Sequence, residues 1–534
     1  MEKQKERFGV LIGCAESAVM KIDRIKVLID ELAKIGYNLL ELNIDDIYKI
    51  EGEPYFGYLR GGYTQAELME LDEYAYSKGI ELVPCIQTLA HLKNLVKIPH
   101  YRDIVDIDHI LLVGEEKTYV LIEKMFQSIR TCFRSNLVNI GMDEAERIGL
   151  GQYLAKNGYT DKYTLLLNHL NRVVDIAKQY GFKPHIYSDM FFKLASGGAY
   201  YGTDIRVNEE VIKKVPKEVE LCYWDYGEHE IKEEIFENMF KEHQKFEREI
   251  WFAGGAWCWD GFAPLNKWSL YSMEPAMRQA RAHGVKNVVI TLWADQSNEC
   301  SFFSVLPSLY ALKQYYEGNF SMESIAKGFY DTFGVKFEDF MLLDLPNKTE
   351  RDKFIRENPC KSLFYNDCFL GWEDYAYSQI PPIPYGNYAR ILQTTAKKMG
   401  KYAYLFTNLS LLCSVMEIKA GLGIETRKAY RAKDIKLLKK LIKDYATVAK
   451  RIKAFTKNFK ARWLRDNKPF GWEIQQIRLG GLYSRVLDCR ERLIEYVKGK
   501  VQDIPELEED ILPYEPAWGL NYNLWRGLIS VGTI

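Results

Sequence analysis

NLVNIGMD, residues 136–143, is a short apolar run that ends on Asp143, with Glu144 directly after it. Seven similar runs occur between residues 8 and 293, separated by longer segments in which apolar residues recur three and four positions apart. We expect the short runs to form strands and the longer segments to form helices. The eight strand segments are FGVLIG (8–13), YNLLELNI (37–44), IELVPCIQ (80–87), NLVNIGMD (136–143), KPHIYSD (183–189), VELCYW (219–224), EIWFAGGA (249–256) and KNVVITLW (286–293).

Strands that alternate with helices predict a parallel sheet, and eight such units in about 300 residues predict a closed α/β barrel of the (β/α)8 or TIM type. An open doubly wound sheet is the alternative, although no glycine-rich phosphate loop follows any of the runs. Beyond about residue 318 the alternation stops, and helical patterns such as 386–421 and 434–455 follow. The sequence therefore predicts a catalytic barrel at 1–317 and an all-helical C-terminal domain at 318–534.

Composition narrows the possible partners of this 534-residue chain. Its 72 basic and 73 acidic residues give a net charge of −1. This balance gives no reason to expect a nucleic-acid partner. The N-terminal stretch MEKQKERFGVLIG has no apolar signal region, and no run of about 18 apolar residues is evident, so we expect no membrane association. Ten scattered cysteines without CxxC spacing predict a reduced, cytoplasmic protein, and eight dispersed histidines predict neither a metal site nor a cofactor.

The active site of such a barrel lies where the strands end, so the residues after each apolar run are the candidates. These residues are Glu16, Asp45, Asp46, Gln87, His91, Asp143, Glu144, Asp189, Tyr223 to Tyr226, Trp257, Trp259, Trp293, Asp295 and Glu299. Carboxylates and aromatic rings dominate, which suits acid–base chemistry on a carbohydrate. The adjacent carboxylates Asp143 and Glu144 would raise each other's pKa, an arrangement that a solvated strand end does not require.

Several of these strand ends resemble those of one enzyme family. NIGMDEA (139–145) resembles the H-x-G-G-D-E strand end of glycoside hydrolase family 20, the exo-β-N-acetylhexosaminidases. The resemblance covers about residues 7–317 and is closest to the bacterial branch without an N-terminal accessory domain. The other stretches that carry it are GEPYFGYLRGGYT (52–64), PCIQTLAHL (84–92), YSDMFF (187–192), CYWDY (222–226), FAGGAWCW (252–259) and LWADQSNECS (292–301).

The resemblance implies substrate-assisted catalysis, in which the acetamide oxygen of the sugar attacks C1 and no glycosyl-enzyme ester forms. Glu144 would be the general acid and later the base, and Asp143 would bind the acetamide N–H. Tyr226 would bind the acetamide oxygen, with Tyr223 the weaker candidate. The implied substrate-binding residues are Glu16, His91, Trp224, Trp257, Trp259, Trp293, Asp295 and Glu299. The implied substrate is a small oligosaccharide or glycoconjugate, and related enzymes suggest a homodimer.

Three departures from the family pattern concern specificity. Glu16 stands where the family has an Arg that grips sugar hydroxyls, and an Arg only donates hydrogen bonds whereas a carboxylate only accepts them. Either Glu16 points to solvent or the preferred sugar has changed. Asn139 and Met142 replace the family's His and second Gly, and Tyr187 stands where a Trp is common.

Two alternatives to a hexosaminidase stay open at this stage. One is a sugar-binding protein of the same fold that has lost or changed its activity through the Glu16 substitution. The other is a metal-dependent sugar isomerase or hydrolase barrel, which would need several clustered histidine and carboxylate ligands. The intact Asp143–Glu144 pair favours catalysis over binding alone.

Overall fold

Eight parallel strands close into a barrel in the computed structural model of the chain, which describes residues 6–194, 197–295, 298–349, 356–513, 524–530 and 532. β1 (Arg7–Gly13) pairs with β2 (Leu39–Asn43) on one side and with β10 (Asn287–Leu292) on the other. This pairing closes the sheet, so the predicted (β/α)8 barrel is confirmed and the open sheet is wrong. The remaining barrel strands are β3 (Glu81–Cys85), β6 (Leu137–Asn139), β7 (Lys183–Tyr187), β8 (Glu220–Trp224) and β9 (Ile250–Gly255).

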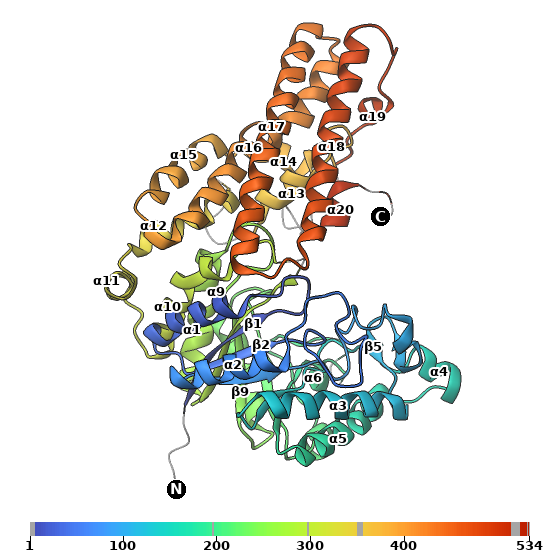
Figure 1. Cartoon of the computed structure of the whole chain (residues 1–534), viewed down its shortest axis with the longest axis vertical. Helices are drawn as coiled ribbons and strands as arrows, with labels where there is room; N and C mark the ends of the chain where they lie inside the picture. Colours follow the sequence, from blue (N-terminus) through green and yellow to red (C-terminus); the bar gives the residue numbers. More distant parts are fainter. Residues whose placement is uncertain are drawn as a thin grey trace. The chain divides into compact units, whose positions relative to one another are not determined.

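Helices between the strands surround the barrel (Figure 1). They are α1 (Ile22–Ile35), α2 (Gln65–Ser77), α3 (Glu116–Cys132), α4 (Gln152–Asn157), α5 (Lys162–Gln179), α6 (Asp189–Lys193), α7 (Glu209–Lys214), α8 (Glu233–Gln244), α9 (Asn266–Ala282) and α10 (Leu306–Tyr316). The 3-10 helix η1 (Pro99–Ile104) and the two-stranded sheet of β4 (Val105–Ile107) and β5 (Ile110–Leu111) lie in the connection from β3 to α3. This long connection lies at the carboxyl end of β3.

The chain forms two compact units that interleave along the sequence. The first comprises Met1–Ala256, Ser269–Ala294 and Ser308–Ile325, and the second comprises Trp257–Trp268, Asp295–Pro307 and Ala326–Ile534. The sequence suggests one division after residue 317. In the structure, the segments after β9 and β10 instead belong to the unit of the C-terminal helices.

The second unit is helical. Its long helices α16 (Ala403–Arg431), α17 (Ile435–Asp466) and α18 (Trp472–Val497) pack side by side (Figure 1). Aromatic rings fill its core, with Phe455 and Phe459 stacked 5.5 Å apart. The other helices of the C-terminal region are α11 (Met322–Phe333), α12 (Phe337–Met341), η4 (Leu342–Asn347), α13 (Pro359–Tyr365), α14 (Asp374–Ser378), α15 (Tyr385–Ala396), η5 (Gly400–Tyr402), α19 (Pro505–Glu508) and α20 (Trp525–Ile529), and η3 (Phe302–Val305) follows β10.

One segment of this unit corrects the expectation that no stretch is long and apolar enough to cross a membrane. Gly400–Arg431, which contains η5 and α16, passes by length and composition, with a mean hydropathy of 1.3 over 18 residues. However, 67% of that 18-residue window is buried inside the protein, as expected of a core helix.

A polar network crosses the barrel interior beneath the carboxyl ends of the strands. The Glu41 carboxylate on β2 lies 2.8 Å from His185 Nε2 on β7, and both side chains are fully buried. Asn139 on β6 donates to Glu41 at 3.2 Å and accepts a hydrogen bond from the Gly141 N–H at 3.0 Å. The His185 ring stacks on Trp251 with centroids 4.3 Å apart. This network ties three strands to the start of the loop that carries Asp143.

The network makes a testable prediction about stability. Glu41→Ala should lower the free energy of unfolding by about 3 kcal/mol, because it leaves His185 and Asn139 buried without their acceptor. Urea denaturation followed by intrinsic fluorescence measures this change. Glu70→Ala, which breaks the exposed ion pair with Lys26, is the matched control and should cost less than about 1 kcal/mol. Equal effects of the two substitutions would contradict the role of the network.

Candidate active site

The loop after β6 carries Asp143 and Glu144 on a tightly turned backbone. Gly141, Met142 and Glu144 adopt left-handed conformations, with φ of 66°, 68° and 51°. A Cβ atom at Gly141 would lie 2.0 Å from Gln87 Oε1, so glycine is required there. Gln87, which follows β3, accepts a hydrogen bond from the Met142 N–H at 3.2 Å and donates one to Asp143 Oδ1 at 3.0 Å. Loops from two neighbouring strands therefore fix the direction of the Asp143 side chain.

The Asp143 carboxylate is ionised, and its side chain is only 14% exposed. His91 Nε2 lies 3.1 Å from Asp143 Oδ2. Burial alone would raise the pKa of Asp143, but His91 and the hydrogen bond from Gln87 outweigh it and hold that pKa below its ordinary value. Burial would also lower the pKa of His91, but Asp143 and Glu144 raise it to about 10. An imidazolium–carboxylate pair is therefore present at neutral pH.

Glu144 has the opposite protonation behaviour. Its carboxyl lies 3.7 Å from His91 Nε2, and 48% of the side chain is exposed. The pKa of Glu144 is raised to about 7, first by the protein that surrounds the carboxyl and then by the negative charge of Asp143. Near neutral pH the site thus pairs an ionised carboxylate with a neighbour that can hold a proton, as general acid catalysis requires.

Asp189, after β7, fixes the backbone of this pair. The Glu144 N–H donates to Asp189 Oδ2 at 3.1 Å, and the Asp189 side chain is fully buried. Lys193 Nζ lies 3.2 Å from Asp189 and 2.7 Å from Glu146, so the buried charge is compensated. These contacts hold the loop after β6 from the side opposite to Gln87 in the strand order.

His91 is itself held by groups from the loops after β2 and β3. The backbone N–H of His91 donates to His109 Nδ1 at 2.8 Å. The two imidazole rings stack with centroids 5.4 Å apart. Asp45 is buried beside this cluster, and burial together with the charge of Asp46 raises the pKa of Asp45 to about 8. The sequence suggested that His91 contacts the substrate. In the structure, the His91 side chain contacts the carboxylates of Asp143 and Glu144.

Three aromatic rings predicted for the site lie together in the first unit. Trp224 and Tyr226 stack with centroids 5.4 Å apart at 25°. Trp293, after β10, lies edge-on to Tyr226 with centroids 6.4 Å apart. Tyr187, the residue in place of a common Trp, lies 6.3 Å from Trp293. The loops after β8 and β10 thus gather these rings.

The structure also distinguishes Tyr226 from Tyr223. Tyr223 is fully buried against Phe240 of α8, with ring centroids 5.2 Å apart. Its hydroxyl donates to Asp225 Oδ2 at 2.6 Å, so this hydroxyl is already committed inside the protein. Tyr226 is the better placed of the two for a ligand contact because it packs with Trp224 and Trp293.

The other four predicted residues belong to the second unit, and their role in substrate binding stays a prediction. Trp257 and Trp259 stack 4.2 Å apart, and the Arg356 guanidinium lies 4.6 Å from the Trp257 ring centroid. Glu299 is buried in ion pairs with Lys361 at 2.7 Å and Arg478 at 3.2 Å. Asp295 and Glu299 both lie in the segment after β10.

Glu16 lies among cationic side chains. Its carboxylate pairs with Lys93 Nζ at 2.6 Å. Arg60, from the loop after β2, donates to the Glu16 carbonyl oxygen at 2.8 Å and also contacts the Ala15 carbonyl and the Asp46 carboxylate. Arg60 therefore brings an arginine side chain to the loop after β1, in which residue 16 itself is a glutamate.

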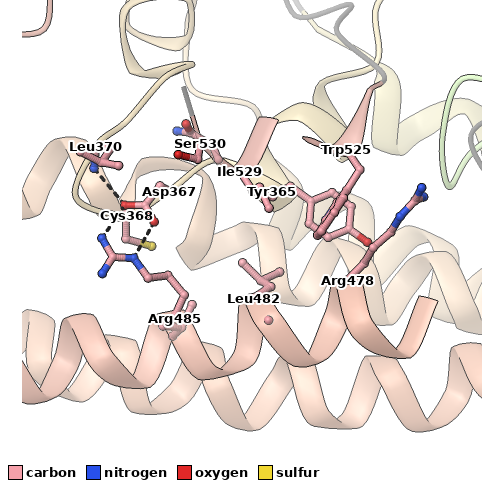
Figure 2. Close-up of a pocket in the computed structure, with 13 residues that line it drawn as sticks. Tyr365, Asp367, Cys368, Leu370, Arg478, Leu482, Arg485, Trp525, Ile529 and Ser530 are labelled. Atoms are coloured by element: carbon pink, nitrogen blue, oxygen red, sulfur yellow. Dashed lines mark hydrogen bonds and ion pairs between the residues drawn. The ribbon is translucent and has the colours of Figure 1, made fainter. Parts of the chain in front are cut away.

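Other parts of the described chain fit catalysis less well. No group of three or more His, Cys, Asp or Glu side chains among the described residues is arranged to hold a metal ion. A cavity of about 300 Å³ lies in the second unit, between Trp525 and the α18 residues Leu482 and Arg485 (Figure 2). Its carboxylate, Asp367, is bound by Arg485 at 2.7 and 3.1 Å and is thus not available as an acid or base.

Comparison with known families identifies the barrel. Residues 15–238 match the glycosyl hydrolase family 20 catalytic domain, and residues 338–523 match the glycoside hydrolase 20C C-terminal domain. The chain belongs to glycoside hydrolase family 20. The catalytic-domain match spans Asp143, Glu144 and Tyr226, so the family that the strand ends suggested is confirmed, while the roles of these residues stay predictions.

Individual relatives are distant. Hexosaminidase D of Bos taurus is 23% identical over 203 residues, which cover 36% of this chain and 55% of that protein. A beta-hexosaminidase of Vibrio furnissii is 25% identical over 210 residues, covering 31% of this chain and 34% of that protein. The solved structure of Flavobacterium johnsoniae chitobiase covers 94% of this chain and 74% of its own, with 14% identity and a TM-score of 0.49. The chain thus spans about half of the bovine relative and a third of the Vibrio relative.

Sequence reasoning missed three residues that shape the site, namely Lys93, Lys193 and Arg60, and it gave no role to Gln87 and Asp189. Gln87 and Asp189 could have been assigned as supports, since both follow apolar runs. Arg60 carries no such signal, because it lies in the middle of a long loop, 14 positions from its partner Asp46.

The His91–Asp143 contact makes a testable prediction about protonation. His91 should stay an imidazolium between pH 6 and pH 8, because Asp143 and Glu144 raise its pKa to about 10. In Asp143→Asn the His91 pKa should fall towards neutrality, because the carboxylate that raises this pKa most is gone. NMR titration of 15N-labelled histidine measures both states. A His91 resonance that titrates near pH 6.5 in the wild-type protein would contradict the pairing.

Proposed function

We propose that the protein is an exo-acting, retaining glycoside hydrolase that removes terminal 2-acetamido-2-deoxy-β-D-hexosides. The supporting observation is the Asp143–Glu144 pair, in which one carboxylate stays ionised while the pKa of its neighbour is raised to about 7. The family supports this activity in general, and the names of the relatives agree with it. The site geometry supports the more detailed mechanism that we propose.

In the proposed mechanism, the acetamide oxygen of the substrate attacks C1 while Glu144 gives its proton to the departing glycosidic oxygen. The ionised Asp143 accepts the acetamide N–H and stabilises the positive charge that forms on the cyclised oxazolinium group. Glu144 then removes a proton from water, which attacks C1 and opens the ring with net retention. Tyr226, packed between Trp224 and Trp293, would donate to the acetamide oxygen.

We further propose that Glu16 alters the choice of sugar. A carboxylate beside Lys93 can accept hydrogen bonds from sugar hydroxyls or from an amine, which the family's arginine cannot do. Arg60 leaves a positive charge against the same loop, where it contacts the Asp46 carboxylate and the Glu16 carbonyl.

The alternatives differ from this proposal in simple assays. A sugar-binding protein of the same fold would bind but not cleave glycosides. A metal-dependent isomerase or hydrolase would lose activity in chelator. We also propose a cytoplasmic location, which is supported by ten buried cysteines, all among the described residues and none in a disulfide. A small oligosaccharide taken up by the cell would then be the substrate, and homodimer formation remains a prediction.

A substrate panel tests the proposed function. Aryl β-glycosides of N-acetylglucosamine and N-acetylgalactosamine should be cleaved at least about 10³-fold faster than the glucoside, because only the acetamide supplies the internal nucleophile. A thiazoline mimic of the cyclised intermediate should inhibit the enzyme. Equal rates on the glucoside, or a trapped sugar ester on the protein, would overturn the mechanism. If Glu16→Arg raised turnover of N-acetylglucosaminides without loss on any other sugar, altered specificity would be refuted.

The acid role of Glu144 makes a separate prediction. Glu144→Gln should lower kcat by about 10²- to 10⁴-fold on glycosides with poor leaving groups, and much less on dinitrophenyl glycosides, which need no proton. With the wild-type enzyme, kcat/KM for poor leaving groups should fall as pH rises through about 7, because Glu144 then loses its proton. Steady-state rates across pH 5–9 measure both effects. Equal loss on the two substrate classes would remove Glu144 from the acid role.

A further inference from the structure

The two ends of the loop after β2 meet at the barrel rim. Its two ends pair, since the Lys49 N–H donates to the Tyr63 carbonyl at 3.0 Å and the Tyr63 N–H donates to the Ile47 carbonyl at 2.9 Å. Inside the loop, Phe56 is fully buried and packs edge-on against Tyr48 with centroids 5.1 Å apart. The loop thus has an apolar anchor of its own.

Close contacts hold this loop against the strand end that supports the catalytic pair. A Cβ atom on Gly57 would lie 2.2 Å from the Asp46 carbonyl oxygen, so the two backbones touch. Arg60 contacts the Asp46 carboxylate and the Glu16 carbonyl. Asp46 directly follows Asp45, whose charge interacts with His91. The loop therefore lies on the same rim of the barrel as Asp143 and Glu144.

On its outer side the loop exposes aromatic rings next to the buried Phe56. Tyr55 is 42% exposed and Tyr58 is 50% exposed. The two rings meet edge-on with centroids 5.9 Å apart, and His100 of η1 lies 5.0 Å from the Tyr55 ring. We call these three residues, Tyr55, Tyr58 and His100, the aromatic rim. Exposed aromatic clusters of this kind usually mark a binding surface.

The chemistry of the aromatic rim suits a neutral, amphipathic ligand. Its rings offer flat apolar faces and its phenols offer hydrogen bonds, the combination that complements a sugar ring. The neighbouring carboxylate of Glu53 is bound by Lys124 at 2.7 Å and by the Tyr101 hydroxyl at 3.2 Å. Since this charge is compensated within the protein, the rim does not offer a site for a cation.

We propose that the aromatic rim binds the sugar units on the leaving-group side of the cleaved bond, so that an oligosaccharide is a better substrate than a simple alkyl glycoside. This inference rests on the proposed function. An exo-acting enzyme holds the terminal sugar at its catalytic pair, so a carbohydrate contact elsewhere on the rim falls on the leaving-group side. Stacking of one further sugar on Tyr55 or Tyr58 then adds affinity that a methyl group cannot gain.

Comparison of two substrates tests this subsite. Tyr55→Ala and Tyr58→Ala should each lower kcat/KM for a β-linked N-acetylglucosamine trisaccharide about tenfold, the loss of roughly one ring contact. The same variants should change kcat/KM for methyl β-N-acetylglucosaminide less than about twofold. Tyr76→Ala is the matched control, because Tyr76 is 64% exposed near the carboxyl end of α2, away from the carboxyl ends of the strands. It should leave both substrates unchanged.

Binding measurements separate failure of the subsite from failure of the proposed function. If the wild-type enzyme cleaves neither substrate, the proposed function is wrong, and calorimetry of the trisaccharide with the Glu144→Gln variant then decides the subsite. Binding that weakens with Tyr58→Ala but not with Tyr76→Ala supports it. Absence of trisaccharide binding, equal losses on the trisaccharide and the methyl glycoside, or no loss on either substrate would overturn it. Circular dichroism confirms that each variant is folded.

Discussion

The contact between His91 Nε2 and Asp143 Oδ2, 3.1 Å long, is the interaction on which the candidate site depends. At 14% exposure this carboxylate would bind a proton more readily if it stood alone. The imidazolium keeps it ionised, and the resulting negative charge helps to keep its neighbour Glu144 protonated near neutral pH. One ion pair thus gives two adjacent carboxylates different tasks.

The barrel supports this arrangement from below and from both sides. Glu41, His185 and Asn139 form a buried polar floor that reaches the Gly141 N–H. Gln87 and Asp189 hold the loop from neighbouring strands. Asn139, which replaces the family's histidine, therefore has a defined task as a bridge between the floor and the loop.

The predicted sugar-binding residues divide between the two units. Tyr226, Trp224 and Trp293 gather in the first unit, at the ends of β8 and β10. Trp257, Trp259, Asp295 and Glu299 lie on segments that pack with the C-terminal helices. The Glu299 carboxylate already forms ion pairs with Lys361 and Arg478. These ion pairs stabilise the segment after β10, whether or not Glu299 also contacts a sugar.

The sequence by itself determined the eight strands, the helical C-terminal region and the carboxylate pair, because periodicity and strand-end motifs are local properties of the chain. Only the tertiary structure decided what holds that pair, since His91 and Gln87 lie more than 50 positions before Asp143. It also decided that Tyr223 faces α8, that Arg60 contacts the loop of Glu16, and that the segments after β9 and β10 join the second unit. Such contacts follow from barrel closure and helix packing, which bring distant residues together and leave no periodic signal in the sequence.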